Sequence, residues 1–173
     1  ANLTISGVTV TGASLSGNGG AFNNSGTLSI SNSTISGNSA TNGRNGGAFF
    51  NSGTLAVTNS TISGNTANYG GGIFNSGGTS TITNSTFSGN STAGGSGAGI
   101  FNQATLTVSN STFSGNSITG SGSGGGISNI FGTFTITNST FSGNSAFSGG
   151  GVANFGTLTI NNSIIANSIS GGD

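Results

Sequence analysis

A single motif repeats along this chain, and its period restricts the fold more than any other feature of the sequence. Each copy reads close to T-L-T-I-x-N-S-T-F-S-G-N and, after a variable stretch, G-G-G-I-F-N. The steps between copies are 25, 27, 25, 26, 28 and 24 residues, measured at Gly7, Asn32, Asn59, Asn84, Asn110, Asn138 and Asn162. A fixed period of about 20–50 residues predicts a stacked array in which each unit packs only against its neighbours.

The amino-acid composition favours strands over helices. Glycine accounts for 36 of 173 residues, proline, cysteine, methionine, tryptophan and histidine are absent, and only Arg44 and Asp173 carry a side-chain charge. Helical repeats need Ala, Leu, Glu and Lys, whereas this chain combines Gly, Ser, Thr and Asn with short apolar alternation. Disorder is a poor explanation because β-branched and aromatic residues fall in register in every copy.

Three short strands are predicted in each copy. In the first strand, represented by Thr105–Ser109, Leu106 and Val108 are two residues apart and therefore share the inward face. The second strand carries one inward apolar residue per copy, at Val10, Ile35, Ile62, Phe87, Phe113, Phe141 and Ile165. The third follows a Gly-Gly or Gly-Ala pair and carries Phe22, Phe49, Ile73, Ile100, Ile127 and Val152. Strands of this length form no sheet alone, so we expect the coils of a parallel β-helix.

Rows of asparagine are expected at the corners of the coils. Asn102, Asn110 and Asn116 represent three such rows, in which side-chain amides bond from coil to coil. Many of these residues lie in N-glycosylation sequons. If the N-S-T asparagines point inward, a glycan there is sterically excluded, and Asn2 is the best candidate for an exposed acceptor.

Two alternating short motifs carry a resemblance to a known family. One is F-x-x-N, at residues 87–90, 113–116 and 141–144, with isoleucine first at Ile35 and Ile62. The other is a GGAI-like tetrapeptide at residues 46–49, 70–73, 97–100 and 124–127. The pair resembles the repeats of polymorphic outer-membrane-protein passengers and of secreted right-handed parallel β-helix repeat proteins. The resemblance covers the whole chain and implies an extracellular or cell-surface setting, although such coils serve adhesins, polysaccharide enzymes and structural rods alike.

The predicted fold class is therefore all-β. We expect a single right-handed parallel β-helix (a β-solenoid) over residues 1–173, with about seven coils of about 26 residues, three short strands per coil and uncapped ends.

The residues that catalytic and metal sites need are missing from this sequence. There is no Glu, Lys or His, and the single Asp at position 173 cannot form the carboxylate pair that glycoside cleavage usually needs. A serine nucleophile has no base to activate it. Glycine-rich calcium loops need Asp ligands, and one arginine makes no nucleic-acid-binding patch. No apolar run is long enough to cross a membrane. We expect no enzyme activity, no cofactor, no metal, no nucleic-acid partner and no membrane insertion.

Length variation is confined to the stretch between the S-G-N corner and the Gly pair. Arg44 and Tyr69 both lie in this stretch. Variable insertions on one face of a repeat array often mark a binding face, and the alternative is a corner that tolerates any length.

The two ends of the sequence support a hypothesis about assembly. The chain starts at Ala1 directly inside a core strand and stops where the next Gly-Gly strand is due, without a cap at either end. We expect head-to-tail self-association into an extracellular homopolymeric filament that does not close. The axial interface would comprise Leu3, Ile5, Val10, Ile164, Ile165 and Ile169. The alternative is an excerpt of a longer passenger with caps elsewhere; the start at Ala1 also fits signal-peptide cleavage.

Two outward features offer further binding hypotheses. The first strand presents a threonine ladder that resembles the ice-binding face of β-solenoid antifreeze proteins, or else reflects the suitability of threonine for exposed strands. Its members are Thr54, Thr58, Thr81, Thr83, Thr105, Thr107, Thr133, Thr135, Thr137, Thr157 and Thr159. The third strand presents a row of Phe50, Phe74 and Phe101, which we expect to be exposed. Such a row bundles rods laterally or binds glycans in an adhesin.

Overall fold

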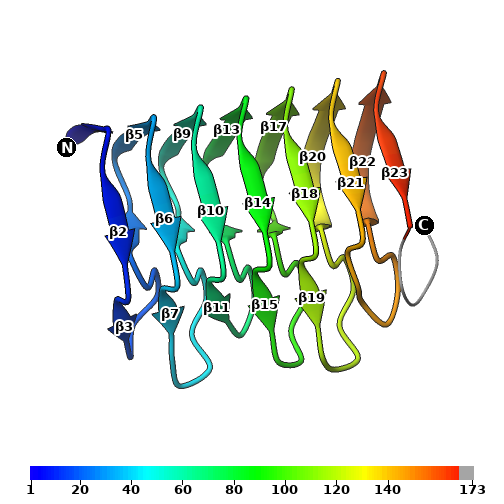
Figure 1. Cartoon of the computed structure of the whole chain (residues 1–173), viewed down its shortest axis with the longest axis horizontal. Coiled ribbons are helices and arrows are strands. Elements are labelled where there is room, and N and C mark those ends of the chain that lie inside the picture. Colours follow the sequence, from blue (N-terminus) through cyan, green and yellow to red (C-terminus); the bar gives the residue numbers. More distant parts are fainter. Residues whose placement is uncertain (168–173) are drawn as a thin grey trace.

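Short parallel strands wind into a rod, and the structure, a computed structural model, describes residues 1–167 of it (Figure 1). Sheet B contains the second strand of every coil. Its seven strands are β2 (Thr9–Thr11), β6 (Thr34–Ser36), β10 (Thr61–Ser63), β14 (Thr86–Ser88), β18 (Thr112–Ser114), β21 (Thr140–Ser142) and β23 (Ile164–Ala166). Each step from one of these strands to the next is one complete coil, so the seven strands delimit six coils. The predicted repeat architecture is therefore confirmed. Residues 1–167 contain no helix that is long and apolar enough to cross a membrane.

Sheet A contains the first and third strands of the coils. The first strands are β1 (Asn2–Ser6), β5 (Thr27–Ser31), β9 (Thr54–Thr58), β13 (Thr79–Thr83) and β17 (Thr105–Ser109). The third strands are β4 (Phe22–Asn24), β8 (Phe49–Asn51), β12 (Ile73–Asn75) and β16 (Ile100–Asn102). Two long strands, β20 (Ile127–Thr137) and β22 (Val152–Asn161), run through both positions and join them into one sheet.

A third sheet uses strands that the sequence pattern did not predict. Sheet C consists of two-residue strands at the start of the variable stretch, namely β3 (Ser14–Leu15), β7 (Ser39–Ala40), β11 (Thr66–Ala67), β15 (Ser91–Thr92) and β19 (Ser117–Ile118). Figure 1 shows these strands below sheet B, with the variable loops beyond them. The loops therefore all leave the rod along one edge.

Equivalent residues stack on one another because the strands pair in register. Leu28 pairs with Leu55, Leu55 with Ser80, Ser80 with Leu106 and Leu106 with Phe134. The one polar member, Ser80, is buried, and its hydroxyl donates to Asn75 Oδ1 at 2.9 Å and accepts from Asn51 Nδ2 at 3.2 Å. A buried hydroxyl is acceptable in an apolar core when it is bonded in this way.

Two of the three asparagine rows form buried ladders. One ladder consists of side-chain amide hydrogen bonds between neighbouring coils, at 2.9–3.0 Å, through Asn38, Asn65, Asn90, Asn116 and Asn144. In the other, the ladder runs through Asn24, Asn51, Asn75, Asn102, Asn129 and Asn154 at 2.7–2.9 Å. Each ladder satisfies the amides of a buried corner, and Asn154, on the last described coil, is the exposed end of the second ladder.

The third asparagine row differs from the expected inward arrangement. The side chains of this row are exposed, and the φ values of its residues are 47° to 50°; its members are Asn32, Asn59, Asn84, Asn110, Asn138 and Asn162. Asparagine tolerates this left-handed conformation better than most residues, and Gly7 with φ 68° occupies the same place in the first coil. The inward place belongs to the following serine, as when the Ser33 backbone N–H donates to Ser60 Oγ at 3.1 Å. Steric exclusion therefore does not protect the N-S-T asparagines from modification.

Candidate ligand-binding pocket

The outer face of the third strands holds a column of stacked phenyl rings. Phe50, Phe74 and Phe101 pair in register on β8, β12 and β16, and their ring centroids lie 5.4 and 5.1 Å apart. Neighbouring planes differ by 8° and 21°, so each ring covers a face of the next. Phe74 and Phe101 are only 7% and 6% exposed. The expectation of an exposed aromatic row is therefore wrong for these two rings, because neighbouring segments cover them.

Tyr69 provides part of that cover because of the turn that follows it. Gly70 has φ 64°, and a Cβ atom there would lie 2.3 Å from the carbonyl oxygen of Ile73, so the turn requires glycine. The turn brings the loop back over the outer face of the sheet. The Tyr69 ring then packs against Phe101 with a centroid distance of 5.1 Å and a tilt of 60°. At 36% exposure, Tyr69 leaves part of its ring open to solvent.

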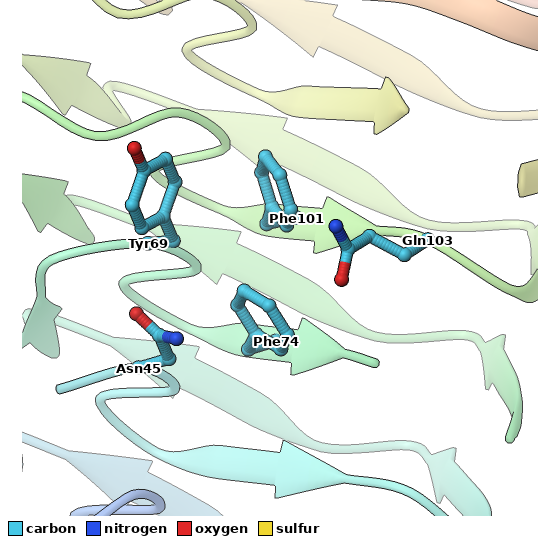
Figure 2. Close-up of a pocket in the computed structure, with 5 residues that line it drawn as sticks. All are labelled: Asn45, Tyr69, Phe74, Phe101 and Gln103. Carbon is cyan, nitrogen blue, oxygen red and sulfur yellow. The ribbon is translucent and has the colours of Figure 1, made fainter. Parts of the chain in front are cut away.

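Asn45 and Gln103 complete a pocket around these rings. Figure 2 shows Tyr69 and Asn45 on one side, Gln103 on the other, and Phe74 and Phe101 between them. The pocket has a volume of about 260 Å³ and is lined by these five residues. Pockets for drug-sized ligands occupy roughly 300–1,000 Å³. This pocket is therefore smaller than the pockets that hold drug-sized ligands.

The hydrogen-bonding groups of the pocket are only partly satisfied. The backbone N–H of Asn45 donates to Asn18 Oδ1 at 3.1 Å, which holds the asparagine in place. Asn45 Oδ1 is buried and has no hydrogen-bond partner within residues 1–167. In that part of the chain the other buried side-chain atom without a partner is Ser128 Oγ, one coil beyond Phe101. Buried polar atoms are normally bonded, so unpartnered ones beside a pocket call for an explanation.

These residue types meet at one place along the rod. In each coil a glycine with positive φ lies shortly before the third strand. The residue directly before this glycine is Asn18 in the first coil, Asn45 and Tyr69 in the next two, and serine at positions 96, 123 and 148. The place of Gln103 is taken by serine at positions 25, 52 and 76. In the two coils after Gln103 the same place is taken by Ile130 and Phe155, so half of each column departs from serine. Sequence reasoning identified Tyr69 and the phenyl rings but missed Asn45 and Gln103, whose signal is this departure from serine.

The other residues singled out from the sequence lie away from the pocket. The ladder threonines are exposed or half-buried on the first strands of sheet A, where Ala56 interrupts one of their rows. Ice binding by this face stays a prediction. Leu3 is 52% exposed on the first described coil. Ile164 is 62% exposed and pairs with Thr140, so it lies in a row of outward-facing side chains on the side of the rod. Ile5, Val10 and Ile165 are partly buried against the core, and Ile169 lies outside the described residues.

Arg44 is exposed in the loop that precedes Asn45. Residues 1–167 contain no group of three or more His, Cys, Asp or Glu side chains that would hold a metal ion. The groups that line the pocket are two amides, a phenol and two phenyl rings, none of which is charged.

Comparison with known proteins agrees with the architecture. Residues 1–169 match the family model described as a right handed beta helix region. No curated protein and no solved structure shows significant similarity to the chain. Because the match extends over nearly the whole sequence, the chain belongs to the right handed beta helix family.

Proposed function

We propose that this protein is a non-enzymatic extracellular β-helix that binds carbohydrate. The observation that carries the proposal is the pocket formed by Asn45, Tyr69, Phe74, Phe101 and Gln103. It combines aromatic rings with amides at one place on a surface that elsewhere consists mainly of Ser, Thr, Gly and Asn. A ligand-binding role fits this local departure better than a purely structural role does.

Carbohydrate suits the chemistry of the pocket because a sugar ring has both hydroxyl groups and an apolar face. The amides of Asn45 and Gln103 can both donate and accept hydrogen bonds. The stacked phenyl rings offer their positive edges, which favour oxygen atoms. The open part of the Tyr69 ring offers a surface for the C–H groups of a sugar.

Binding without catalysis is the simpler reading of the lining residues. General acid–base catalysis needs a group that changes protonation near the working pH, usually His, Glu, Asp or Lys. The pocket contains amides, a phenol and phenyl rings. An extracellular setting fits a glycan ligand and the resemblance to secreted repeat proteins.

The experiment uses the single tyrosine of the chain, which lies in the pocket. Because there is no tryptophan, the intrinsic fluorescence of the protein reports on Tyr69. We expect methyl glycosides of glucose, galactose or mannose, or of the matching uronic acids, to change this emission in a saturable way. The Gln103→Ser variant should bind the same sugar several-fold more weakly, since a hydrogen bond contributes about 0.5–1.5 kcal/mol.

Serine is the residue that the chain places at the equivalent position of three other coils, so Gln103→Ser should fold normally. Thr107→Ser, on another face of the rod, is the matched control and should leave the affinity unchanged. If no sugar in the panel alters Tyr69 emission or gives heat in calorimetry, the carbohydrate proposal is wrong.

A second candidate function is head-to-tail association, favoured by the exposed apolar side chains of the outermost described coils. Leu3 is 52% exposed and Ile160 is 43% exposed. Their equivalents in the adjacent coils, Leu28 and Ile136, are buried. Another coil of the same kind, whether from the same chain or from a second copy, would bury them.

A further inference from the structure

The single basic residue of the sequence directly precedes a residue that lines the pocket. Arg44 is the only Lys or Arg among 173 residues, and it directly precedes Asn45, which lines the pocket. On the neighbouring coil, the backbone N–H of Asn68 donates to the carbonyl oxygen of Arg44 at 2.8 Å. Asn68 in turn precedes Tyr69. The backbone of Arg44 is thus fixed next to both residues that form one wall of the pocket.

The charge of Arg44 is not neutralised by a neighbouring side chain. Residues 1–167 contain no Asp or Glu, so no carboxylate side chain in the described part of the chain can pair with the guanidinium. Arg44 is exposed, and its long side chain has freedom to reach a bound molecule. On a surface with almost no other charge, a single cation sets the sign of the local potential.

We infer that the sugar held in the pocket carries a carboxylate, and that Arg44 pairs with it at the rim. The inference rests on the proposed carbohydrate-binding function and specifies the class of sugar. The ring occupies the space between Tyr69 and Gln103, while the carboxylate faces the loop at residues 41–45. A planar guanidinium matches a carboxylate through two parallel N–H···O bonds, which an amide or hydroxyl of a neutral sugar does not provide.

The test compares matched sugars that differ only at C6. Methyl glucuronide and methyl glucoside, and the corresponding galactose and mannose pairs, are titrated against wild-type protein, Arg44→Gln and Arg44→Lys, with Tyr69 fluorescence and calorimetry as readouts. We expect a uronide to bind wild type about three- to five-fold more tightly than its neutral partner, the upper part of the range for an exposed ion pair. Arg44→Gln should remove this preference, whereas Arg44→Lys should retain most of it.

Salt provides a second readout that a merely structural role for Arg44 would not affect. At about 1 M salt, where the Debye length falls to roughly 3 Å, the preference for the uronide should disappear while the affinity for the neutral sugar stays the same. Equal binding of the two sugars in wild type, with no effect of Arg44→Gln, overturns the inference and leaves the carbohydrate proposal standing. If no sugar of any pair binds, both are wrong.

Discussion

At the scale of single residues, asparagine has two distinct roles in this rod. Asn90 is fully buried, and its Oδ1 accepts hydrogen bonds from both the backbone N–H and the side-chain Nδ2 of Asn65, each at 3.0 Å. Its Nδ2 donates to the carbonyl oxygen of Ile62 and to Asn116 Oδ1, both at 2.9 Å. Asn110, in contrast, is exposed and contributes a backbone conformation with φ 50°. The same residue type thus satisfies buried groups at one corner and permits a turn at another.

Replacing Asn90 with alanine should destabilise the protein strongly. The backbone N–H of Asn65 would lose its acceptor and the carbonyl oxygen of Ile62 would lose a donor, both within the buried corner. Each buried group left unsatisfied costs about 1–3 kcal/mol, so we expect the free energy of unfolding to fall by roughly 2–4 kcal/mol. Chemical denaturation followed by circular dichroism measures this change.

The control is Asn110→Gly, which keeps the left-handed conformation and removes only an exposed amide. Glycine occupies the equivalent place in the first coil, at Gly7. We expect a change within about 0.5 kcal/mol, as at most surface positions. Equal effects of the two substitutions would contradict the distinction between the buried ladder and the exposed row.

At the scale of elements, the strands of sheets A and B share the volume of the core between them. The third strands of the first two coils supply Phe22 and Phe49, which stack at 5.2 Å, and the second strands that face them supply Ile35 and Ile62. In the next three coils, phenylalanine is on the second strands and isoleucine is on the third strands. Phe87, Phe113 and Phe141 stack on sheet B at 4.7 Å, and the third strands supply Ile73, Ile100 and Ile127.

Glycine accompanies the phenylalanines of sheet B. A Cβ atom at Gly72, Gly99 or Gly126 would lie 3.2, 3.2 or 2.9 Å from Cδ1 of Phe87, Phe113 or Phe141. Where the facing residue is Ile35 or Ile62, the equivalent positions are Ala21 and Ala48, whereas the last described coil combines Gly151 with Ile165. In the first two coils the extra methyl group is thus present where the ring is absent, as close packing of the interior favours.

This complementarity predicts that Gly99 and Phe113 are energetically coupled. Gly99→Ala should lower the free energy of unfolding by about 1–3 kcal/mol, because the added methyl group overpacks the core. Phe113→Ile on that background should recover part of the loss, although the carbonyl oxygen of Gly126, 2.4 Å from the new Cβ, still has to shift. Denaturation of both single variants and the double variant gives the coupling energy, expected at about 1 kcal/mol. Simple additivity would show that the two positions do not share a volume.

Sequence reasoning predicted the elements whose pattern repeats and missed those that depend on neighbouring loops. The alternation of Leu106 and Val108 and the recurrence of like residues fixed the first strands and their register, since a one-residue slip would expose the core side. Sheet C was missed because two residues, such as Ser39 and Ala40, show no periodicity. The Tyr69 ring that packs against Phe101 comes from a loop of variable length. The pocket joins residues from several coils, which no single copy of the motif reveals.

At the scale of the whole molecule, the sides of the rod and its two outermost described coils differ in chemistry. The sides present mostly Ser, Thr, Asn and Gly, with all strand edges inside the rod paired. The outermost coils leave β1 and β23 without a neighbour on one side within residues 1–167. Apolar side chains and unpaired backbone groups therefore coincide there, which is the combination that drives strand-to-strand association.

We expect the chain to associate end to end in a concentration-dependent way. Leu3→Lys and Ile160→Lys place a charge on opposite end coils and should each abolish association, because burial of an unpaired ammonium group is strongly unfavourable. Thr107→Lys adds the same charge on the side of the rod and serves as the control. Sedimentation velocity over a wide concentration range distinguishes the variants. A wild-type protein that stays monomeric throughout excludes this mode of assembly.

The buried asparagine ladders give the rod a direction. In both ladders, the amide nitrogen of one coil donates to the amide oxygen of the coil that follows it in sequence, from Asn24 to Asn51 and from Asn38 to Asn65 onward. The amide dipoles are therefore aligned head to tail along the axis, with acceptors toward the first coil and donors toward the last. Two rods that meet with opposite orientation would set donor against donor or acceptor against acceptor. Any axial contact between copies must preserve this polarity, so a polymer of this chain would have chemically distinct ends.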